Sequence, residues 1–344
     1  MAARDKPNEL YLTRVFDAPV KLVWDAWTDP KQVGQWWGPR GFTLTTHSRD
    51  LRPGGTWVYT MHGPDGTDYP NIATYFEVEK HARLVYDHGA TENTPPLFRV
   101  TVNFKEAKGK TKMDMTMALA TPEAAQETRK FIKKAGGEST WDRLAEYLHE
   151  AGGKDKFVIN RTFDAPIGLM FEMWTNPEHL AQWLPPTGML TKFMKGDVKK
   201  GGRTFFCMEG VNGVMYARAE YLEVTKPNRI VYTQQFCDEN QQPTRHPLAP
   251  TWPETMLTTV VLDAEDENRT RVTVTWEVFG EASAAECDTF HNAKGGMTQG
   301  WTGSFDKLDQ YMMQERMAEL SQRLANQNAA AARAMDDSTA DGLS

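Results

Sequence analysis

The chain has 344 residues, the length of about two domains, and its hydrophobic (40%) and charged (25%) fractions are those of a globular protein. A net charge of −7 argues against a nucleic-acid surface, which is usually basic. The sequence has no apolar run long enough to span a bilayer, no apolar signal-peptide core near its start, and three cysteines without metal-ligand spacing. We therefore expect a cytoplasmic protein with no membrane span, no nucleic-acid partner and no bound metal or cofactor.

The first predicted element is a strand over Glu9–Phe16, where β-branched and aromatic residues dominate. A helix is expected next, because the apolar residues from Val20 to Trp27 recur at the spacing of one helix face. Pro30 then opens a second short helix, which ends at the pair Trp36-Trp37.

A run of strands follows these helices. Trp57, Tyr59 and Met61 alternate with other residues, which is the period of a strand with one aromatic face. Further strands are expected over 42–51, 69–79, 83–88, 97–105 and 112–119. Short turns between these strands predict an antiparallel meander rather than βαβ units. A long helix that ends with Trp141, Leu144 and Leu148 is expected to close this half.

The whole pattern occurs twice. Arg161–Pro177 repeats Arg14–Pro30 at an offset of 147 residues, whereas Tyr221–Lys226 answers Tyr75–Lys80 at an offset of 146, so one residue is missing from a turn. An offset of this size indicates duplication of a domain, because solenoid repeats recur roughly every 20–50 residues. We predict domains over 1–150 and 157–314, a linker over 151–156, and an Ala-rich helical extension with a disordered tail over 315–344.

The helix expected to close the second half has an apolar stripe from Phe290 to Met312 and four glycines, at positions 295, 296, 300 and 303. Each glycine inside a helix costs roughly 0.8–1 kcal/mol relative to alanine. We therefore expect a close approach to this helix, by the sheet or by a ligand.

Short motifs recur in the same order in both halves: Phe16-Asp-Ala-Pro19, Trp27-Thr-Asp-Pro30 and Arg83-Leu-Val-Tyr86 in the first, and Phe163-Asp-Ala-Pro166, Trp174-Thr-Asn-Pro177 and Arg229-Ile-Val-Tyr232 in the second. This arrangement resembles the START-like (SRPBCC) superfamily, above all the branch named after the activator of the Hsp90 ATPase. The resemblance implies an α+β fold of two tandem helix-grip domains. In each, a curved antiparallel sheet wraps around a long C-terminal helix and leaves an apolar cavity.

The two copies differ near the expected cavity. The second has Leu184-Pro185 where the first has Trp37-Gly38, and it carries a longer loop over Gln241–Pro253. The two cavities therefore need not hold the same ligand, and one of them can be filled by side chains.

The candidate cavity residues are large side chains on strands and helices. The offset pairs Tyr59 with Phe206, Met61 with Met208 and Tyr69 with Tyr216. The full set is Trp36, Tyr59, Met61, Tyr69, Tyr86, Trp183, Phe206, Met208, Tyr216, His291, Met297 and Trp301. Each of them is compatible with core packing as well as with ligand contact.

The sequence contains no nucleophile elbow, phosphate-binding glycine loop or zinc-protease motif. His88, at the end of a strand, is a candidate general base or an ordinary surface histidine. Three functions remain open. The first is binding of a hydrophobic small molecule (lipid, polyketide or aromatic metabolite) by one or both domains. The others are a chaperone-associated protein-interaction module and an enzyme of the cyclase or hydrolase type.

Overall fold

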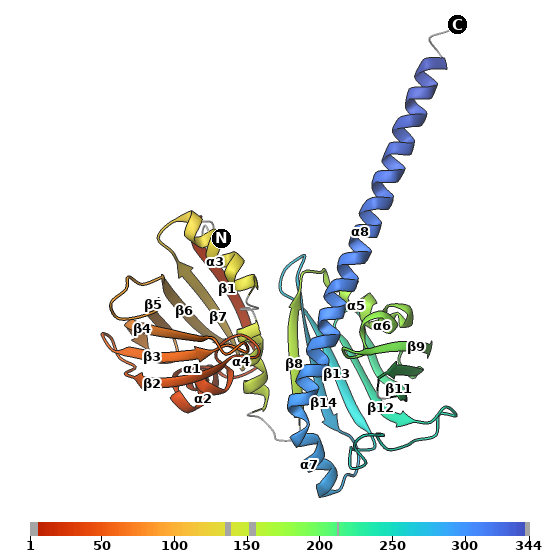
Figure 1. The fold of residues 1–344 in the computed structure, drawn as a ribbon, viewed down its shortest axis with the longest axis horizontal. Helices are drawn as coiled ribbons and strands as arrows, with labels where there is room; N and C mark the ends of the chain where they lie inside the picture. Colours follow the sequence, from red (N-terminus) through yellow and green to blue (C-terminus); the bar gives the residue numbers. More distant parts are fainter. Residues whose placement is uncertain (1–5, 135–138, 151–155, 212, 341–344) are drawn as a thin grey trace. The chain divides into compact units, whose positions relative to one another are not determined.

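The computed structural model describes residues 6–134, 139–150, 156–211 and 213–340. The chain divides into two compact units, Met1–Arg161 and Thr162–Ser344, and the boundary falls inside the first strand of the second sheet. Each half has an open, seven-stranded antiparallel sheet with helices (Figure 1). The expected α+β fold of two tandem domains is confirmed.

The elements of the first half are β1 (Glu9–Phe16), α1 (Val20–Thr28), α2 (Pro30–Trp36), β2 (Thr43–Arg49), β3 (Thr56–His62), β4 (Asp68–Glu79), β5 (Arg83–Gly89), β6 (Phe98–Ala107), β7 (Lys110–Ala118), α3 (Pro122–Lys134) and α4 (Ser139–Glu150). The strands lie in the order β1-β7-β6-β5-β4-β3-β2, so six of them form a meander and β1 joins its last strand.

The elements of the second half are β8 (Lys156–Phe163), α5 (Ile167–Thr175), α6 (Pro177–Trp183), β9 (Met189–Gly196), β10 (Arg203–Gly210), β11 (Gly213–Thr225), β12 (Arg229–Cys237), β13 (Met256–Ala264), β14 (Thr270–Val278), α7 (Ala284–Asn292) and α8 (Lys294–Ala340). Their strand order, β8-β14-β13-β12-β11-β10-β9, repeats that of the first half. Because β8 already begins at Lys156, that residue belongs to the sheet and not to the expected linker.

The two short helices of each half begin at the same local signal. The Asp29 side chain accepts a hydrogen bond from the backbone nitrogen of Lys31 at 2.8 Å, and Pro30 follows the cap. In the second half, Asn176 accepts from the backbone nitrogen of Glu178 at 2.9 Å. A side-chain oxygen that satisfies a free N–H at the helix start, followed by proline, explains why both helices begin there.

The apolar faces of α1 and α5 are buried as their spacing predicts. Val23, Trp24 and Trp27 are at most 3% exposed in the first half, as are Met170 and Trp174 at the matching positions of the second. Burying one such side chain contributes about 1.5–3 kcal/mol. Packing of these apolar faces therefore stabilises α1 and α5, which are too short to be stable as isolated helices.

The closing segments differ between the halves. The single long helix expected in the first half is described as two helices, α3 and α4, on either side of residues 135–138, which lie outside the described residues. In the second half a short helix, α7, precedes α8, which continues as a helix to Ala340. The expected helical extension from 315 thus coincides with α8 as far as Ala340, and the tail expected after it falls on residues 341–344, which lie outside the described residues.

The glycines of α8 have different surroundings. A Cβ built on Gly303 would lie 2.2 Å from Oγ1 of Thr187, in the connection between α6 and β9. Positions 295, 296 and 300 have open space around them. Only Gly303 thus marks a close approach, and the group that approaches is a loop, not the sheet.

A basic side chain from the closing helix holds the loop that follows the short helices. In the first half, Arg143 donates to the backbone carbonyls of Gly38 at 2.8 Å and Pro39 at 3.0 Å. In the second half, Nζ of Lys307 donates to the carbonyls of Pro185 at 2.9 Å and Met189 at 2.8 Å. These bonds fix the loop that carries the residues bordering the site described next.

Candidate functional site

The second half contains a hollow between its short helices and its sheet. Its cavity volume is about 20 Å³, room for about one water molecule. The total empty space, which includes open solvent at the mouth, is about 380 Å³. The lining residues come from α5, α6 and strands β9 to β12: Trp174, Leu180, Leu184, Met194, Thr204, Phe206, Ala219, Tyr221, Ile230, Tyr232 and Gln234. None of these lining residues carries a charge.

The polar atoms of this lining are neutral. The hydroxyls of Thr204 and Tyr221 lie 3.4 Å apart. Burial raises the pKa of Tyr221 to about 12 and raises the pKa of Tyr232 well above its usual value. Both phenols therefore stay protonated at neutral pH. The lining can bind an uncharged molecule and contains no group that would act as a general base there.

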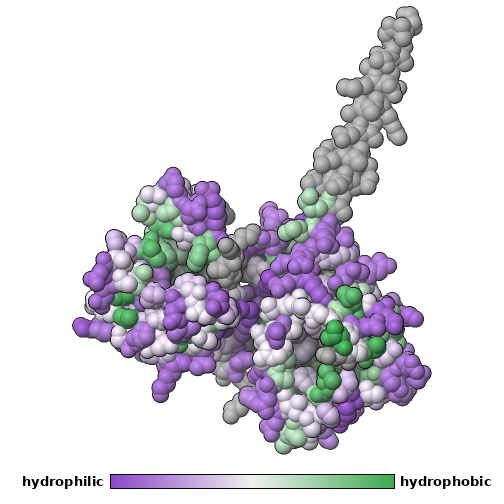
Figure 2. All heavy atoms as spheres, in the orientation of Figure 1, coloured by the Kyte–Doolittle hydropathy of each residue, from purple (hydrophilic) through white to green (hydrophobic). Residues whose placement is uncertain are grey.

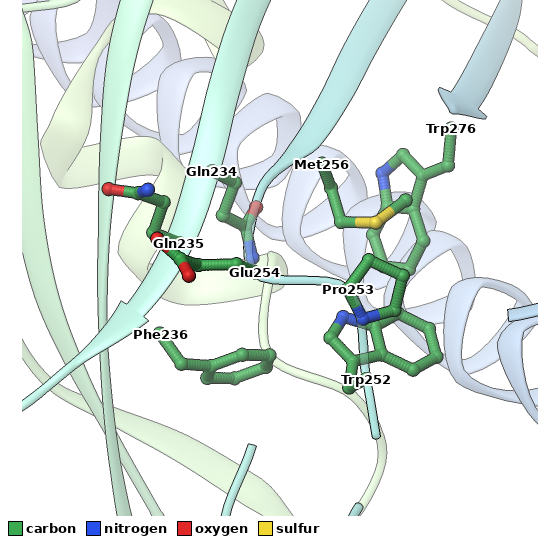
Figure 3. A pocket seen from close by; sticks show the side chains of 8 residues that line it. All are labelled: Gln234, Gln235, Phe236, Trp252, Pro253, Glu254, Met256 and Trp276. Atoms are coloured by element: carbon green, nitrogen blue, oxygen red, sulfur yellow. The ribbon is translucent and has the colours of Figure 1, made fainter. Parts of the chain in front are cut away.

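A second hollow adjoins the first along β12. It has about 320 Å³ of empty space, again including open solvent, and Gln234 lines both hollows. Figure 3 shows Trp252 and Pro253 beside Met256 and Trp276, with Phe236 across from them. The walls thus come from β12 to β14 and from the long loop between β12 and β13.

Polar contacts hold this loop, 238–255, against α7. Arg245 pairs with Glu286, and the Thr251 and Thr289 hydroxyls lie 2.8 Å apart. Hydrogen bonds from Ser283, together with Arg245, lower the pKa of Glu286 to about 2. The loop is therefore anchored at the rim of the second hollow.

The matching region of the first half is filled by rings. Trp37, the counterpart of Leu184 at the end of the short helix, lies 5.2 Å from Trp57 and 6.4 Å from Tyr59 between ring centroids. Trp57 occupies the position of Thr204, since each lies opposite an alanine of the next strand, Ala73 or Ala219. Two indoles of the first half thus replace a leucine and a threonine that border the hollow.

Three of the first-half candidates lie in this filled core. Trp36, Tyr59 and Tyr86 are at most 5% exposed. The Trp36 indole Nε1 donates to the Ala26 carbonyl at 3.0 Å. Met61 is partly buried and packs against the same cluster, whereas Tyr69 is 36% exposed and lies 5.8 Å from the ring of Phe42.

The candidates of the second half are spread over several places. Phe206 lines the first hollow, and Met208 packs beside it in a small apolar cluster. Trp183 is fully buried, and its Nε1 donates to the Met173 carbonyl at 3.1 Å. Met297 is buried on α8, and His291 is exposed on α7.

Trp301, on α8, lies behind both hollows. Its ring stacks against Trp174 of the first hollow, with centroids 6.0 Å apart, and meets Trp276 of the second edge to face at 5.6 Å. Trp301 itself is not among the residues that line either hollow, so its contact with a ligand stays a prediction.

The placement expected for Tyr216 is wrong. Met61 lies opposite Tyr69, eight residues on, whereas Met208 lies opposite Met215, seven residues on, so the second hairpin has one residue fewer between equivalent positions. Tyr216 is therefore on the opposite face of the sheet from Phe206, stacked on Phe205. A shift of one residue moves a strand side chain to the other face.

Several lining residues were not among the candidates, chiefly Trp174, Tyr221, Tyr232 and Gln234. The corrected offset of 146 relates Tyr221 and Tyr232 to Tyr75 and Tyr86, so that offset was the signal that could have found them.

Among the residues that the structure describes, no three His, Cys, Asp or Glu side chains gather as a metal site would require. In the same part of the chain, no helix has the length and apolarity to cross a bilayer. Figure 2 shows apolar side chains among polar ones on the visible face of each half.

Comparison with protein-family models identified one family that matches both halves of the chain. The family model described as Activator of Hsp90 ATPase homolog 1-like protein matches residues 17–149 and 164–313. A comparison with curated proteins gave no match.

Among solved structures, the chain is similar to protein Ms6760 from Mycobacterium smegmatis, with 29% identity and a TM-score of 0.39 over 42% of this chain and 93% of that one. A protein from Arthrobacter aurescens has 27% identity and a TM-score of 0.39, over 43% of this chain and 92% of its own. The di-domain ARO/CYC protein BexL, from the BE-7585A biosynthetic pathway, has 14% identity and a TM-score of 0.37, over 88% and 97%.

Proposed function

Because the chain belongs to the family of Activator of Hsp90 ATPase homolog 1-like proteins, we propose that its second half binds a small hydrophobic molecule in the hollow between α5, α6 and the sheet. The observation that carries this proposal is the contrast between the halves. Where the first half has Trp37 and Trp57, the second has Leu184 and Thr204, and a hollow lies beside these smaller side chains.

The lining suits such a ligand. Aromatic and aliphatic side chains form most of the wall, and a few hydroxyl and amide groups can fix the orientation of a bound molecule, as in other small-molecule sites. A charged ligand is disfavoured, because none of the residues lining this hollow would pair with its charge. The first half, filled by its own rings, is assigned a structural part.

Native mass spectrometry of the full chain purified from its host cells tests the proposal. We expect one apolar molecule per chain, released on denaturation. In the variant Leu184→Trp, which introduces the residue of the first half, the bound molecule should be lost. Leu190→Trp, at a position on β9 that is 74% exposed, is the matched control and should keep it.

Two results would contradict the proposal. One is equal retention of the molecule by the Leu184→Trp variant and the wild type. The other is a ligand-free protein whose melting temperature does not respond to a panel of lipids and aromatic metabolites. That second result would favour the protein-interaction function instead.

A further inference from the structure

The solvent face of the first sheet carries a row of polar side chains that joins three strands, β2, β3 and β4. Thr60 and His62 alternate along β3 with Tyr59, which is buried in the core, so both lie on the other face of the sheet. Asp68 lies directly opposite His62, and Thr45 lies diagonally opposite it. Cross-strand neighbours of this kind are close enough for their side chains to interact.

Two hydrogen bonds connect a hydroxyl, an imidazole and a carboxylate in this row. Oγ1 of Thr45 lies 2.8 Å from Nε2 of His62, and Nδ1 of the same ring lies 2.6 Å from Oδ1 of Asp68. A carboxylate oxygen can only accept a hydrogen bond, so Nδ1 of His62 carries the proton that is donated to Asp68. In the neutral ring Nε2 is then the acceptor, and the Thr45 hydroxyl donates to it. The three groups have the order of a Ser-His-Asp triad, in which the imidazole activates the hydroxyl as a nucleophile.

The fold does not require this triad. Cross-strand pairs contribute only about 0.2–1 kcal/mol each. The second half has the same strand order with Phe193, Glu209 and Val214 at the three matching positions, so its sheet forms without these hydrogen bonds. The triad is therefore a feature of the first half that strand pairing does not explain.

The triad is open to a reactant from solvent. Thr45 is exposed, and the side chains of His62 and Asp68 are 36% and 66% exposed. Because β2 is the last strand of its sheet, the backbone N–H groups on its outer side have no partner strand among the described residues. Such groups can donate to the oxygen that becomes negative when a carbonyl carbon is attacked. An open surface stabilises a transition state only weakly, so the substrate that fits is already reactive, namely an ester with a good leaving group.

We propose that Thr45, His62 and Asp68 form an acyl-transfer site, in which the Thr45 hydroxyl attacks the carbonyl carbon of an activated carboxylic ester. Nε2 of His62 takes the hydroxyl proton as the new C–O bond forms, and it returns this proton to the alcohol that leaves when the old ester bond breaks. The products are the acyl ester of Thr45 and the free alcohol. Asp68 does not touch the substrate and is a positioning residue for the ring of His62. The site lies in the first half and does not depend on the ligand binding proposed for the second.

Acetylation of the full chain by p-nitrophenyl acetate at neutral pH tests this proposal, with the acetyl group located over time by peptide mapping and mass spectrometry. Thr60 is the internal control. Its hydroxyl lies 2.8 Å from Nε2 of His47, and this histidine has no ion pair with a carboxylate in the part of the chain that the structure describes. A general base contributes about 10²–10⁴-fold in enzymes, and for this open site we expect Thr45 to react at least about 10-fold faster than Thr60. The difference should vanish in the urea-unfolded chain, where the triad is not assembled.

Substitutions separate the parts of the two partners. His62→Gln removes the base and should slow acetylation of Thr45 to the rate seen at Thr60. His47→Gln, the matched control at the neighbouring histidine, should leave acetylation of Thr45 unchanged within about twofold. Asp68→Asn should lower the rate about 10-fold, because an amide does not fix the tautomer of the ring, and Asp68→Glu should restore most of it. Rescue by a carboxylate is an effect that a change in packing would not produce.

Three results would overturn the proposal. The first is an equal rate at Thr45 and Thr60 in the folded wild type, a comparison that needs no substitution and is therefore independent of whether a variant folds. The second is an unchanged rate at Thr45 in the His62→Gln variant, because the imidazole would then not be the base. The third is an equal rate in the wild type and Asp68→Asn, which would exclude the carboxylate from the site.

Discussion

His88 gives the most direct test of the packing in the first half. It lies on β5 with its ring stacked on Phe98, at 4.7 Å between centroids, and near Tyr59. Burial lowers the pKa of His88 to about 4, from the ordinary histidine value of 6.5. Gln234 occupies the same position in the second half, since both residues lie opposite an alanine of the neighbouring strand. The natural perturbation is therefore His88→Gln.

The direction of the pH dependence of stability follows from proton binding at His88 in the folded and unfolded chain. Between pH 6.5 and 4 the unfolded chain binds a proton at His88 and the folded chain does not, so the free energy of unfolding falls as the pH falls through this window. One pKa unit is worth about 1.4 kcal/mol, so the loss should reach about 2 kcal/mol at pH 5 and about 3 kcal/mol below pH 4. Above pH 6.5 the histidine contributes no pH dependence.

Hydrogen exchange of β5 and β6 peptides, followed by mass spectrometry at pH 7.5 and pH 5, reports the stability of this sheet alone, after correction for the intrinsic exchange rate. We expect the wild type to lose about 2 kcal/mol more than His88→Gln between these two pH values. The carboxylates titrate in both proteins and cancel in the difference. If the two proteins show the same pH dependence, His88 is protonated in the folded state with an ordinary pKa, and the argument from burial is wrong.

Two further predictions concern the closing helix of the second half, and both are checked by urea unfolding of the full chain. Gly303→Ala should destabilise the protein by about 1–3 kcal/mol, because the new Cβ would meet Thr187. The control Gly300→Ala, at a position with open space, should stabilise the protein by about 0.5–1 kcal/mol. Equal effects of the two substitutions would exclude the close approach at Gly303. Lys307→Met keeps the apolar stem but removes the charged donor to three backbone carbonyls. The free energy of unfolding should fall by about 1.5–3 kcal/mol. A fall below about 0.5 kcal/mol would mean that water replaces the ammonium group without loss of stability.

The fold was predictable because its signals are local and occur twice. The cap residues Asp29 and Asn176, the helix faces of α1 and α5, and the alternation of β3 each follow from short-range spacing, and the structure has all of them. The duplication also supplied an internal check, since two segments with different residues keep the same pattern. The strand order then follows from short turns between antiparallel strands.

The site was only partly predictable. Phe206 was found because the offset of 147 is correct up to the turn after β10, and Tyr216 was misplaced because the missing residue lies in that turn. The replacement of Trp37 by Leu184 was visible in the sequence. Whether that replacement leaves space depends on how the stacked pair Trp174 and Trp301 is positioned by α8, which is a property of tertiary packing.

The position of the loop at the rim of the second hollow could not be predicted from the sequence, for a different reason. A longer loop is expected from the sequence over Gln241–Pro253, but its position depends on Arg245 and Glu286, which are 41 residues apart. Contacts between such distant residues leave no periodic pattern. Trp252 could therefore not be assigned to a pocket wall from spacing alone.

For the proposed ligand binding, the ring-filled first half provides an internal control for the second half. Both copies have the same strand order and are present at the same concentration in every sample, whatever the purity or the buffer. A compound that perturbs both copies equally acts through the solvent or through nonspecific adsorption. A response confined to the copy with Leu184 and Thr204 indicates specific binding. The copy with Trp37 and Trp57 is the negative control for that response.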